Sequence, residues 1–258
     1  MAGQPALRGL KDKVALVTGA GSGIGRASAQ RLAAEGALVA VADIDGERAQ
    51  ETVAMIRDAG NTARAFSADV SVADDVERLI ASVVDGFGRI DIAHNNAGIL
   101  LDRHPMLVDT TEAEWDRIMS VNLKGVWLCL RAELRIMATA GRGVIVNSSS
   151  AAALRAGPGG SAYATTKAGI IMLTKTAAVE HASQGIRVNA IAPGMVRTPP
   201  LDDAFTRDPE FAQRMTQMTP MQRISDPAEI AAVVAWLASD DASYMTGTTV
   251  IADGGAVA

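Results

Sequence analysis

A tyrosine and a lysine stand four residues apart in the segment Ala162–Gly169, which reads AYATTKAG. On a helix this spacing places Tyr163 and Lys167 on one face, about one turn apart. A lysine ammonium beside a phenol favours the phenolate and lowers the tyrosine pKa from its usual value of about 10. The pair therefore predicts a base for removing the proton of a hydroxyl group, although an ordinary helix surface could show the same spacing.

Three adjacent serines end an apolar run in the segment Gly143–Ser150. In open α/β sheets, ligands bind beyond the carboxyl ends of the strands. A serine hydroxyl at such a strand end would polarise a substrate oxygen, whereas its alternative use is to satisfy the local backbone. We expect at least one of the three serines to have only this structural use.

A glycine-rich segment, Gly19–Gly25, follows the apolar run VALVT and precedes an alanine-rich helix candidate. Glycines permit a tight turn close to a pyrophosphate, and a helix N-terminus presents free N–H groups to the anion. The alternative is a plain strand-to-helix turn, because the spacing differs from the general G-x-G-x-x-G fingerprint. The residues expected at the phosphates are Gly19, Ser22, Gly23, Ile24 and Gly25.

An acidic residue, Asp43, ends the second apolar run, which reads VAVAD. A carboxylate at this position accepts hydrogen bonds from the adenine-ribose hydroxyls and would repel the 2′-phosphate of NADP. Arg26 offers the opposite possibility, because a guanidinium could receive that phosphate. Since Ser22 adds no positive charge to the turn, we expect NAD and consider NADP less favoured. The alternative is that Asp43 only opens the following loop.

Short apolar runs alternate with longer amphipathic segments along the chain. Most of the runs are continuously apolar, which is typical of strands that are covered on both faces. The alternation predicts one α/β domain over residues 1–258, a Rossmann-type doubly wound parallel sheet of about seven strands with helices on both faces. Strands are expected at Val14–Thr18, Ala37–Asp43, Ala63–Ala68, Ile90–Asn95, Gly143–Ser148, Ile186–Ala192 and Thr248–Ala252, and helices at Gly23–Glu35, Gly46–Ala59, Ala73–Phe87, Glu112–Ala140, Ala162–Ser183 and Pro227–Ala238.

Residues 197–225 contain four prolines and interrupt this alternation. A breaker-rich insertion inside a domain is typical of a surface loop or lid. Its apolar side chains would line an apolar ligand site, because methionines adapt to varied shapes, or would simply pack the lid onto the body. They are Leu201, Phe205, Phe211, Met215, Met218 and Met221.

Composition excludes several classes of protein. The single cysteine, Cys129, cannot form an intrachain disulfide, and the three histidines are scattered, so we expect no metal site. A net charge of −5 disfavours a nucleic-acid partner. No apolar run reaches the ~18 residues that span a bilayer, and the first residues resemble no signal peptide, so we expect a cytoplasmic protein. Alanine and glycine, 48 and 24 residues, together make 72 of the 258 residues, which predicts close packing of helices on the sheet.

Taken together, the motifs resemble those of the short-chain dehydrogenase/reductase family over almost the whole chain. They are TGAGSGIG at Thr18–Gly25, Asp69-Val70, NNAG at Asn95–Gly98, VNLKG around Asn122, the serine strand end, Tyr163–Lys167 and PGMVRTP at Pro193–Pro199. The chain departs from the usual pattern at Thr165-Thr166, where alanine and serine are common, and at Ala153, where glycine is often found.

The resemblance implies a catalytic set of Asn122, Ser150, Tyr163 and Lys167. Tyr163 would be the acid/base, and Lys167 would lower its pKa and bind the nicotinamide ribose. Ser150 would polarise the substrate oxygen, since it stands 13 residues before Tyr163, the family's usual separation. Asn122 would hold a water that connects the lysine to solvent.

The resemblance also implies a larger set of cofactor-binding residues. Asp43 and Ile44 would lie at the adenine ribose, Asp69 and Val70 at the adenine, and the segment after the fourth strand along the adenosine. The remaining ones are Asn95, Ala97, Gly98, Tyr163, Lys167, Pro193, Gly194, Val196 and Thr198.

The implied reaction is hydride transfer between NAD(H) and a secondary alcohol or ketone, with a hydrophobic or alicyclic substrate. Ser150, Ala152, Leu154 and Tyr163 would contact it, while Arg155 is expected to be a solvated loop arginine. Two alternatives are a 3-oxoacyl-[acyl-carrier-protein] reductase and, in another class, a non-catalytic dinucleotide-binding sensor. The resemblance further suggests a homotetramer.

Overall fold

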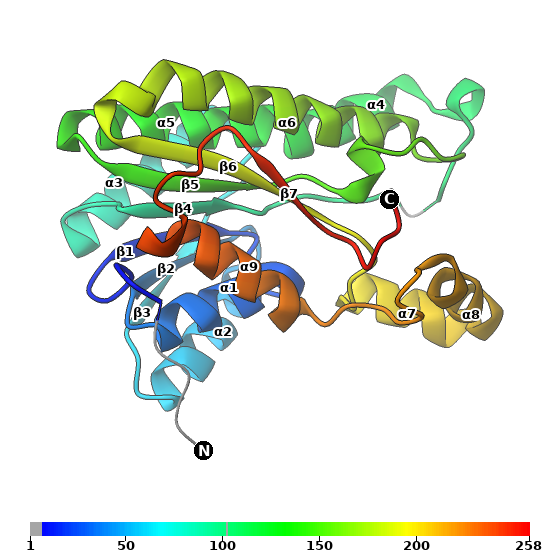
Figure 1. Ribbon diagram of the computed structural model, residues 1–258, viewed down its shortest axis with the longest axis horizontal. Helices are drawn as coiled ribbons and strands as arrows, with labels where there is room; N and C mark the ends of the chain where they lie inside the picture. The colour runs from blue at the N-terminus through cyan, green and yellow to red at the C-terminus, as the bar shows by residue number, and fades with distance from the viewer. Residues whose placement is uncertain (1–6, 102) are drawn as a thin grey trace.

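The computed structural model describes residues 7–101 and 103–258, so the expectation for the first residues falls partly outside the described part. Its centre is a parallel sheet of seven strands in the order β3-β2-β1-β4-β5-β6-β7 (Figure 1). This confirms the predicted doubly wound sheet. The strands are β1 Val14–Thr18, β2 Leu38–Asp43, β3 Ala63–Ser67, β4 Ile92–Asn95, β5 Gly143–Ser148, β6 Ile186–Pro193 and β7 Thr249–Ala252.

Helices cover both faces of the sheet (Figure 1). Helices α1, α2 and α9 enclose one apolar core with the sheet, and α3, α5 and α6 enclose the other. The helices are α1 Gly23–Ala34, α2 Gly46–Asp58, α3 Ala73–Phe87, α4 Glu112–Ile118, α5 Gly125–Ala140, α6 Ser161–His181, α7 Pro199–Arg207, α8 Pro209–Met218 and α9 Pro227–Ala238. No helix in the described ranges is long and apolar enough to cross a bilayer.

Small residues bring the layers close together, as the composition predicts. Ala29 and Ala235 are fully buried in the core beneath α1 and α9. A Cβ at Gly169 of α6 would lie 2.8 Å from Leu123, and one at Gly125 would lie 2.9 Å from Val70. Because real Cβ atoms do not approach so closely, these glycines set the spacing between segments that border the site.

The predicted long helix Glu112–Ala140 is interrupted. A π-helical stretch, Met119–Lys124, separates α4 from α5, and the amide of Gly125 donates to the carbonyl of Ser120. Such π-bulges insert one extra residue into a helix and often occur at functional sites. Hydrophobic periodicity cannot reveal this stretch, because the helix axis continues through it.

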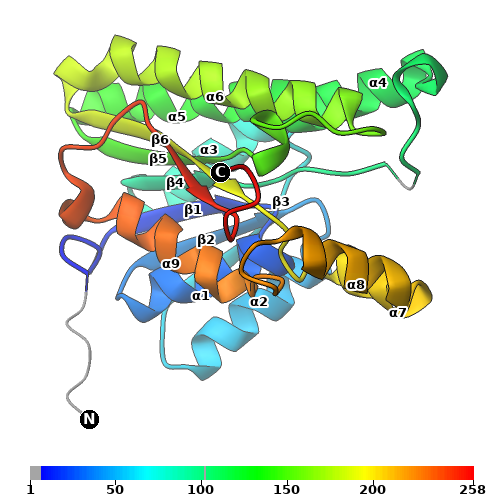
Figure 2. The same cartoon turned by 45° about the vertical axis from the view of Figure 1, so that its right-hand side comes forward.

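The prediction of an irregular segment at 197–225 is wrong in its local structure. The segment forms α7 and α8, which project from the carboxyl edge of the sheet (Figure 2). Both helices begin at a proline, where the missing N–H costs nothing, and the carboxylate of Asp208 caps α8 by accepting from Phe211 N at 2.9 Å. The prolines therefore start helices here rather than exclude them.

Candidate active site

The sequence-predicted site residues converge on the carboxyl edge of the sheet. Strand order reverses between β1 and β4, which are neighbours in the sheet although β2 and β3 lie between them in sequence. At such a reversal the connections leave toward opposite faces and open a crevice beyond the strand ends. The glycine-rich segment follows β1, and the Asn95–Gly98 segment follows β4, so both border this crevice.

The glycine-rich turn is built so that no side chain fits inside it. A Cβ on Gly25 would overlap the carbonyl oxygen of Gly19, and a Cβ on Gly19, whose φ is +61°, would lie 2.7 Å from Ala97. Ser22 caps α1 without a side-chain hydrogen bond, and the first turn has no acidic residue. The N–H groups at this helix end therefore remain free for an anion, which fits a pyrophosphate.

The segment after β4 is hydrogen-bonded to the glycine-rich turn. Asn96 Nδ2 donates to the carbonyls of Thr18 and Gly19, both at 3.2 Å, and the Thr18 hydroxyl accepts from the amides of Asn96 and Ala97. Asn96 thus joins the two loops that border the crevice. We did not predict this residue, although its place in the NNAG motif was the available signal.

Asp43 is oriented by the turn that it faces. Its carboxylate accepts from Gly21 N at 2.8 Å and from Asp45 N at 3.0 Å. Arg26 is already engaged, since it donates to the carbonyl of Gly21 and forms an ion pair with Glu51 at 2.9 Å. The carboxylate of Asp43 therefore faces the glycine-rich turn, whereas the guanidinium of Arg26 is neutralised by Glu51.

Tyr163 and Lys167 lie in the first two turns of α6, as predicted. Lys167 is 4% exposed, and its Nζ donates to the carbonyl of Ser148 at 2.8 Å and lies 5.5 Å from the centre of the Tyr163 ring. Ser150 lies close enough to Tyr163 to lower the pKa of its phenol. Three of the four predicted catalytic side chains are therefore grouped at one strand end.

The expected effect of the lysine on the tyrosine is not found. Burial raises the pKa of Tyr163 above its ordinary value, and the nearby Ser150 side chain partly offsets this rise. Burial also lowers the pKa of Lys167 to about 8. The reason is geometric, because Nζ is directed to the carbonyl of Ser148 and lies over the ring of the tyrosine.

Asn122 lies in the π-helical stretch and is fully buried. Its Oδ1 accepts from Ile99 N at 2.8 Å, and its Nδ2 donates to Ile99 O at 2.9 Å. A Cβ on Gly98 would lie 3.3 Å from Asn122 Oδ1 and 3.6 Å from Lys167 Nζ. Asn122, Gly98 and Lys167 are therefore adjacent, which places the fourth predicted catalytic residue beside the lysine.

Two of the three serines at the end of β5 make only internal hydrogen bonds, and the third faces the site, in line with the expectation that at least one is structural. Ser148 Oγ lies 3.0 Å from His94 Nε2, and Ser149 Oγ donates to the carbonyl of Lys167 at 2.8 Å. Both are buried, whereas Ser150 is partly exposed and meets Tyr163. His94 is buried next to this serine, and burial together with Lys167 lowers its pKa to about 3, so it is neutral. No grouping of three potential metal ligands occurs within the described residues.

The other predicted cofactor residues take different places. Thr198 lies beside the turn, since its Cγ2 would be 3.1 Å from a Cβ on Gly23, and Gly194 packs on Asp253. Asp69 accepts hydrogen bonds from the amide and hydroxyl of Ser71, and Val70 is buried beside Gly125.

Three further predicted cofactor residues lie at strand ends or in the core. Pro193 is the last residue of β6, and Ile44 is exposed just beyond the end of β2. Val196 is buried in an apolar cluster with residues of α9.

The side chain of Asn95 turns into the protein. It is 1% exposed and donates to Glu133 and Asn147 rather than to open space. Any contact of this residue with a cofactor would therefore come from its backbone. Glu133, a fully buried carboxyl group, was not predicted, because its helical pattern is that of an ordinary polar position.

The expected substrate side has an exposed apolar rim. Leu154, Met218 and Met221 are about half exposed, while Ala152 is partly buried. Arg155, which was expected to be solvated, donates to the carbonyl of Ala256 at 2.8 Å and so joins the loop after Ser150 to the C-terminal segment.

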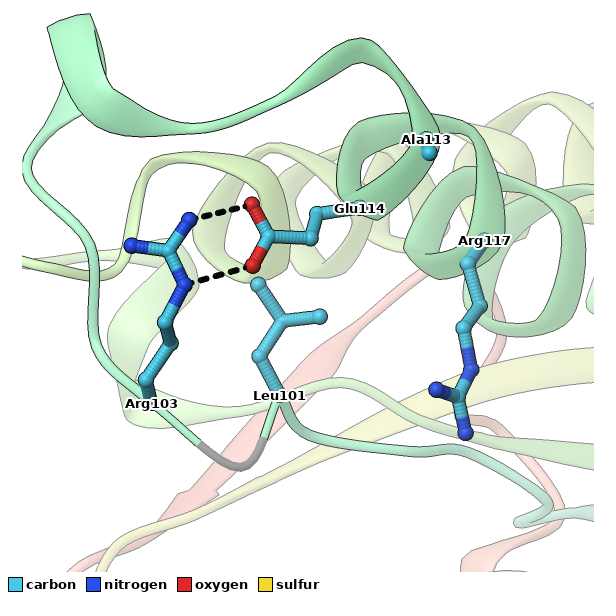
Figure 3. Close-up of a pocket in the computed structure, with 5 residues that line it drawn as sticks. All are labelled: Leu101, Arg103, Ala113, Glu114 and Arg117. Atoms are coloured by element: carbon cyan, nitrogen blue, oxygen red, sulfur yellow. Dashed lines mark hydrogen bonds and ion pairs between the residues drawn. The ribbon is translucent and has the colours of Figure 1, made fainter.

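A shallow pocket of about 380 Å³ lies where the segment after β4 meets α4. Figure 3 shows Arg103 and Glu114 facing each other as a bidentate pair, with Leu101 between them and Arg117. The residues that line this pocket do not include those expected to contact the substrate, namely Ser150, Ala152, Leu154 and Tyr163.

The site and fold define a class of protein, and comparison with known proteins agrees. A family model described as enoyl-(acyl carrier protein) reductase matches residues 19–257. The chain belongs to the short-chain dehydrogenase/reductase family and is an oxidoreductase.

Particular relatives cover nearly the whole chain. Levodione reductase of Leifsonia aquatica is 43% identical over 95% of this chain and 94% of its own length. 3beta-Hydroxysteroid dehydrogenase 1 of Eggerthella lenta is 45% identical with the same coverage. The crystal structure of levodione reductase superposes with a TM-score of 0.91 at 42% identity, over 95% of this chain and 97% of that one.

Proposed function

We propose that this oxidoreductase transfers a hydride between NAD(H) and a secondary alcohol or ketone with a hydrophobic or alicyclic frame. The observation that carries the proposal is the grouping of Ser150, Tyr163 and Lys167 beside Gly98, at the same sheet edge as the glycine-rich turn. A proton-transfer site and an anion-binding turn on one crevice are what such a reaction requires.

The crevice fits a dinucleotide. The free N–H groups before α1 would hold the pyrophosphate, Asp43 and Ile44 the adenine ribose, and Asp69 and Val70 the adenine. Lys167 would hold the second ribose, with Val196 and Thr198 at the carboxamide. When bound, the nicotinamide supplies the hydride chemistry.

The protein's own side chains place the substrate and move its proton. The side chains of Ser150 and Tyr163 lie close together, so a substrate oxygen that enters between them would receive a hydrogen bond from each hydroxyl group. Tyr163 then exchanges the proton with that oxygen, and Lys167 favours its phenolate form once Nζ leaves the carbonyl of Ser148. Asn122, bonded to Ile99, fixes the wall beside the lysine.

The preference for NAD over NADP rests on charge. The carboxylate of Asp43 is held against the glycine-rich turn by the amide of Gly21, and in this proposal a 2′-phosphate on the adenine ribose would meet a like charge there. Arg26 is the only basic candidate that we considered for that phosphate, and its guanidinium is engaged by Glu51.

An apolar substrate is supported by the exposed rim of Leu154, Met218 and Met221 and by relatives named for levodione and for a 3beta-hydroxysteroid. In this proposal α7 and α8 act as the lid. We also propose a homotetramer located in the cytoplasm, consistent with one buried cysteine and with exposed apolar residues on α5 and α6.

The test is reduction of NAD and of NADP at equal concentrations by the purified protein, with a panel of alicyclic and aliphatic secondary alcohols. A 3-hydroxyacyl thioester is included as the substrate of the carrier-protein alternative. We expect oxidation of an alicyclic alcohol with NAD. Preference for NADP would contradict the cofactor proposal, and activity with the thioester alone would contradict the substrate class.

A further inference from the structure

A chain of buried polar side chains lies beneath the site and has no part in the proposed proton transfer. Asn95 Nδ2 donates to Glu133 Oε2 at 2.9 Å and to Asn147 Oδ1 at 3.0 Å, and Asn147 Nδ2 donates to Thr174 Oγ1 at 2.9 Å. All four side chains are at most 1% exposed. They connect β4, β5, α5 and α6 at the point where the site residues leave the sheet.

Two oxygens in this chain are left without a hydrogen-bond partner. They are Glu133 Oε1 and Asn95 Oδ1, and they belong to the two side chains that already share the 2.9 Å hydrogen bond. Two acceptor oxygens cannot satisfy each other unless one of them carries a proton. An unsatisfied buried oxygen is costly, so a proton between them resolves both.

We propose that Glu133 is a positioning residue that holds a proton in the folded protein. It donates this proton to Asn95 Oδ1 while accepting from Asn95 Nδ2. The resulting acid–amide pair fixes the end of β4, from which the Asn95–Gly98 segment begins. The consequence for cofactor binding rests on the proposed function, whereas the protonation itself does not.

The surroundings of Glu133 favour the neutral acid. Within residues 7–101 and 103–258, no charged side chain forms a hydrogen bond or ion pair with it. Cys129 lies near it on its own helix, and the amide of Asn95 on β4 connects it to Asn147 on β5 and, through Asn147, to Thr174 on α6. On α3, Glu77 is paired with Arg131 and Arg135 of α5, while on α6 the lysine of the site is directed to the carbonyl of Ser148.

Burial raises the pKa of Glu133 to about 7, partly opposed by the hydrogen bond from Asn95. Between pH 4.5, the ordinary glutamate pKa, and about pH 7, the folded protein therefore holds the proton on Glu133, whereas the unfolded chain does not. The stability that this proton contributes is complete below the unfolded value and is lost as the pH rises through about 7.

The decisive variant is Glu133→Gln, because an amide donates and accepts in the same pattern as the protonated acid and cannot ionise. The matched control is Glu180→Gln, which removes a carboxylate from an exposed position of α6. Thermal unfolding of the protein without cofactor is followed from about pH 5 to about pH 8. We expect wild type and Glu133→Gln to agree at the acidic end, and the variant to unfold at a higher temperature at the alkaline end.

NADH binding, measured over the same pH range, reports whether the Asn95–Gly98 segment keeps its position at the site. We expect affinity of the wild type to weaken above about pH 7 relative to Glu133→Gln, with Glu180→Gln following the wild type. Difference infrared spectra should show a protonated-carboxyl band in the wild type near pH 6 that is absent from Glu133→Gln. A Glu133→Gln protein that is less stable at every pH, or that lacks any pH-dependent difference, overturns the proposal. Loss of NADH binding by all three proteins would instead contradict the proposed function.

Discussion

At the scale of single residues, the pKa values of Tyr163 and Lys167 both shift in directions that oppose formation of the tyrosine phenolate. Burial raises the pKa of Tyr163, which disfavours its phenolate, and lowers that of Lys167 to about 8, which weakens the positive charge that would favour the phenolate. The sequence spacing identified both residues, but it could not show that the lysine is directed to the carbonyl of Ser148. That direction depends on how β5 and α6 pack.

The first prediction concerns Tyr163→Phe. The change removes the hydroxyl that exchanges the substrate proton and leaves the partly buried ring in place. We expect turnover to fall by roughly 10²- to 10⁴-fold, the range for general acid–base catalysis, with NADH affinity nearly unchanged. Steady-state rates and fluorescence titration with NADH would measure the two effects. Near-native turnover would show that another group carries the proton.

The second prediction follows from the lowered pKa of Lys167. Between about pH 8 and pH 10.5, the ordinary lysine pKa, the folded protein binds fewer protons than the unfolded chain. The buried lysine therefore destabilises the fold fully below about pH 8, and this destabilisation decreases as the pH rises above 8. Lys167→Met should therefore abolish activity while unfolding at no lower temperature than wild type near neutral pH. The difference in unfolding temperature between the variant and the wild type, measured by thermal unfolding, should decrease as the pH approaches 10. A variant that is equally destabilised at all pH values would contradict the expectation.

At the scale of elements, the glycine-rich turn was predictable from sequence because its function needs the absence of side chains. The π-helical stretch that carries Asn122 and the helices α7 and α8 were not. The extra residue shifts the apolar pattern by a single position within a long apolar segment, an offset that the helix prediction did not resolve, and prolines both end and begin helices. The π-helical stretch is held by contacts with another segment, such as the pairing of Asn122 with Ile99.

The third prediction tests the turn. In Gly25→Ala the new Cβ would overlap the carbonyl oxygen of Gly19, so the turn must open. We expect NADH affinity to fall by at least 10-fold while the fold persists, measured by titration and circular dichroism. Gly46→Ala is the matched control, since its Cβ would meet only Ser67 at an ordinary 3.6 Å. Equal affinities for the two variants would contradict the assigned role of the turn.

At the scale of the whole molecule, α5 and α6 lie side by side over one face of the sheet (Figure 1). Exposed apolar residues on these two helices include Trp127, Met172 and Val179. Val179 is 84% exposed, which is unusual for a valine on a long helix. We therefore place one interface of the proposed homotetramer on these two helices.

The fourth prediction is that Val179→Glu lowers the assembly state. A buried, unpaired carboxylate in an interface is costly, so the variant should sediment as a smaller species than the wild type. Lys175→Glu, on the same helix, serves as a charge-changing control at an exposed polar position. A wild type that sediments as a monomer, or a variant with an unchanged sedimentation coefficient, would contradict the placement.

The amino-acid sequence by itself determined the doubly wound sheet, the family and the identity of the catalytic candidates. These follow from local patterns, namely apolar runs that must be buried, glycines that must lack side chains and a four-residue spacing on a helix. Only the tertiary structure decided which partner each polar group meets. It joined Asn96 to the glycine-rich turn, directed Lys167 to Ser148 and enclosed Glu133 against Asn95, because those contacts connect segments that are distant in sequence.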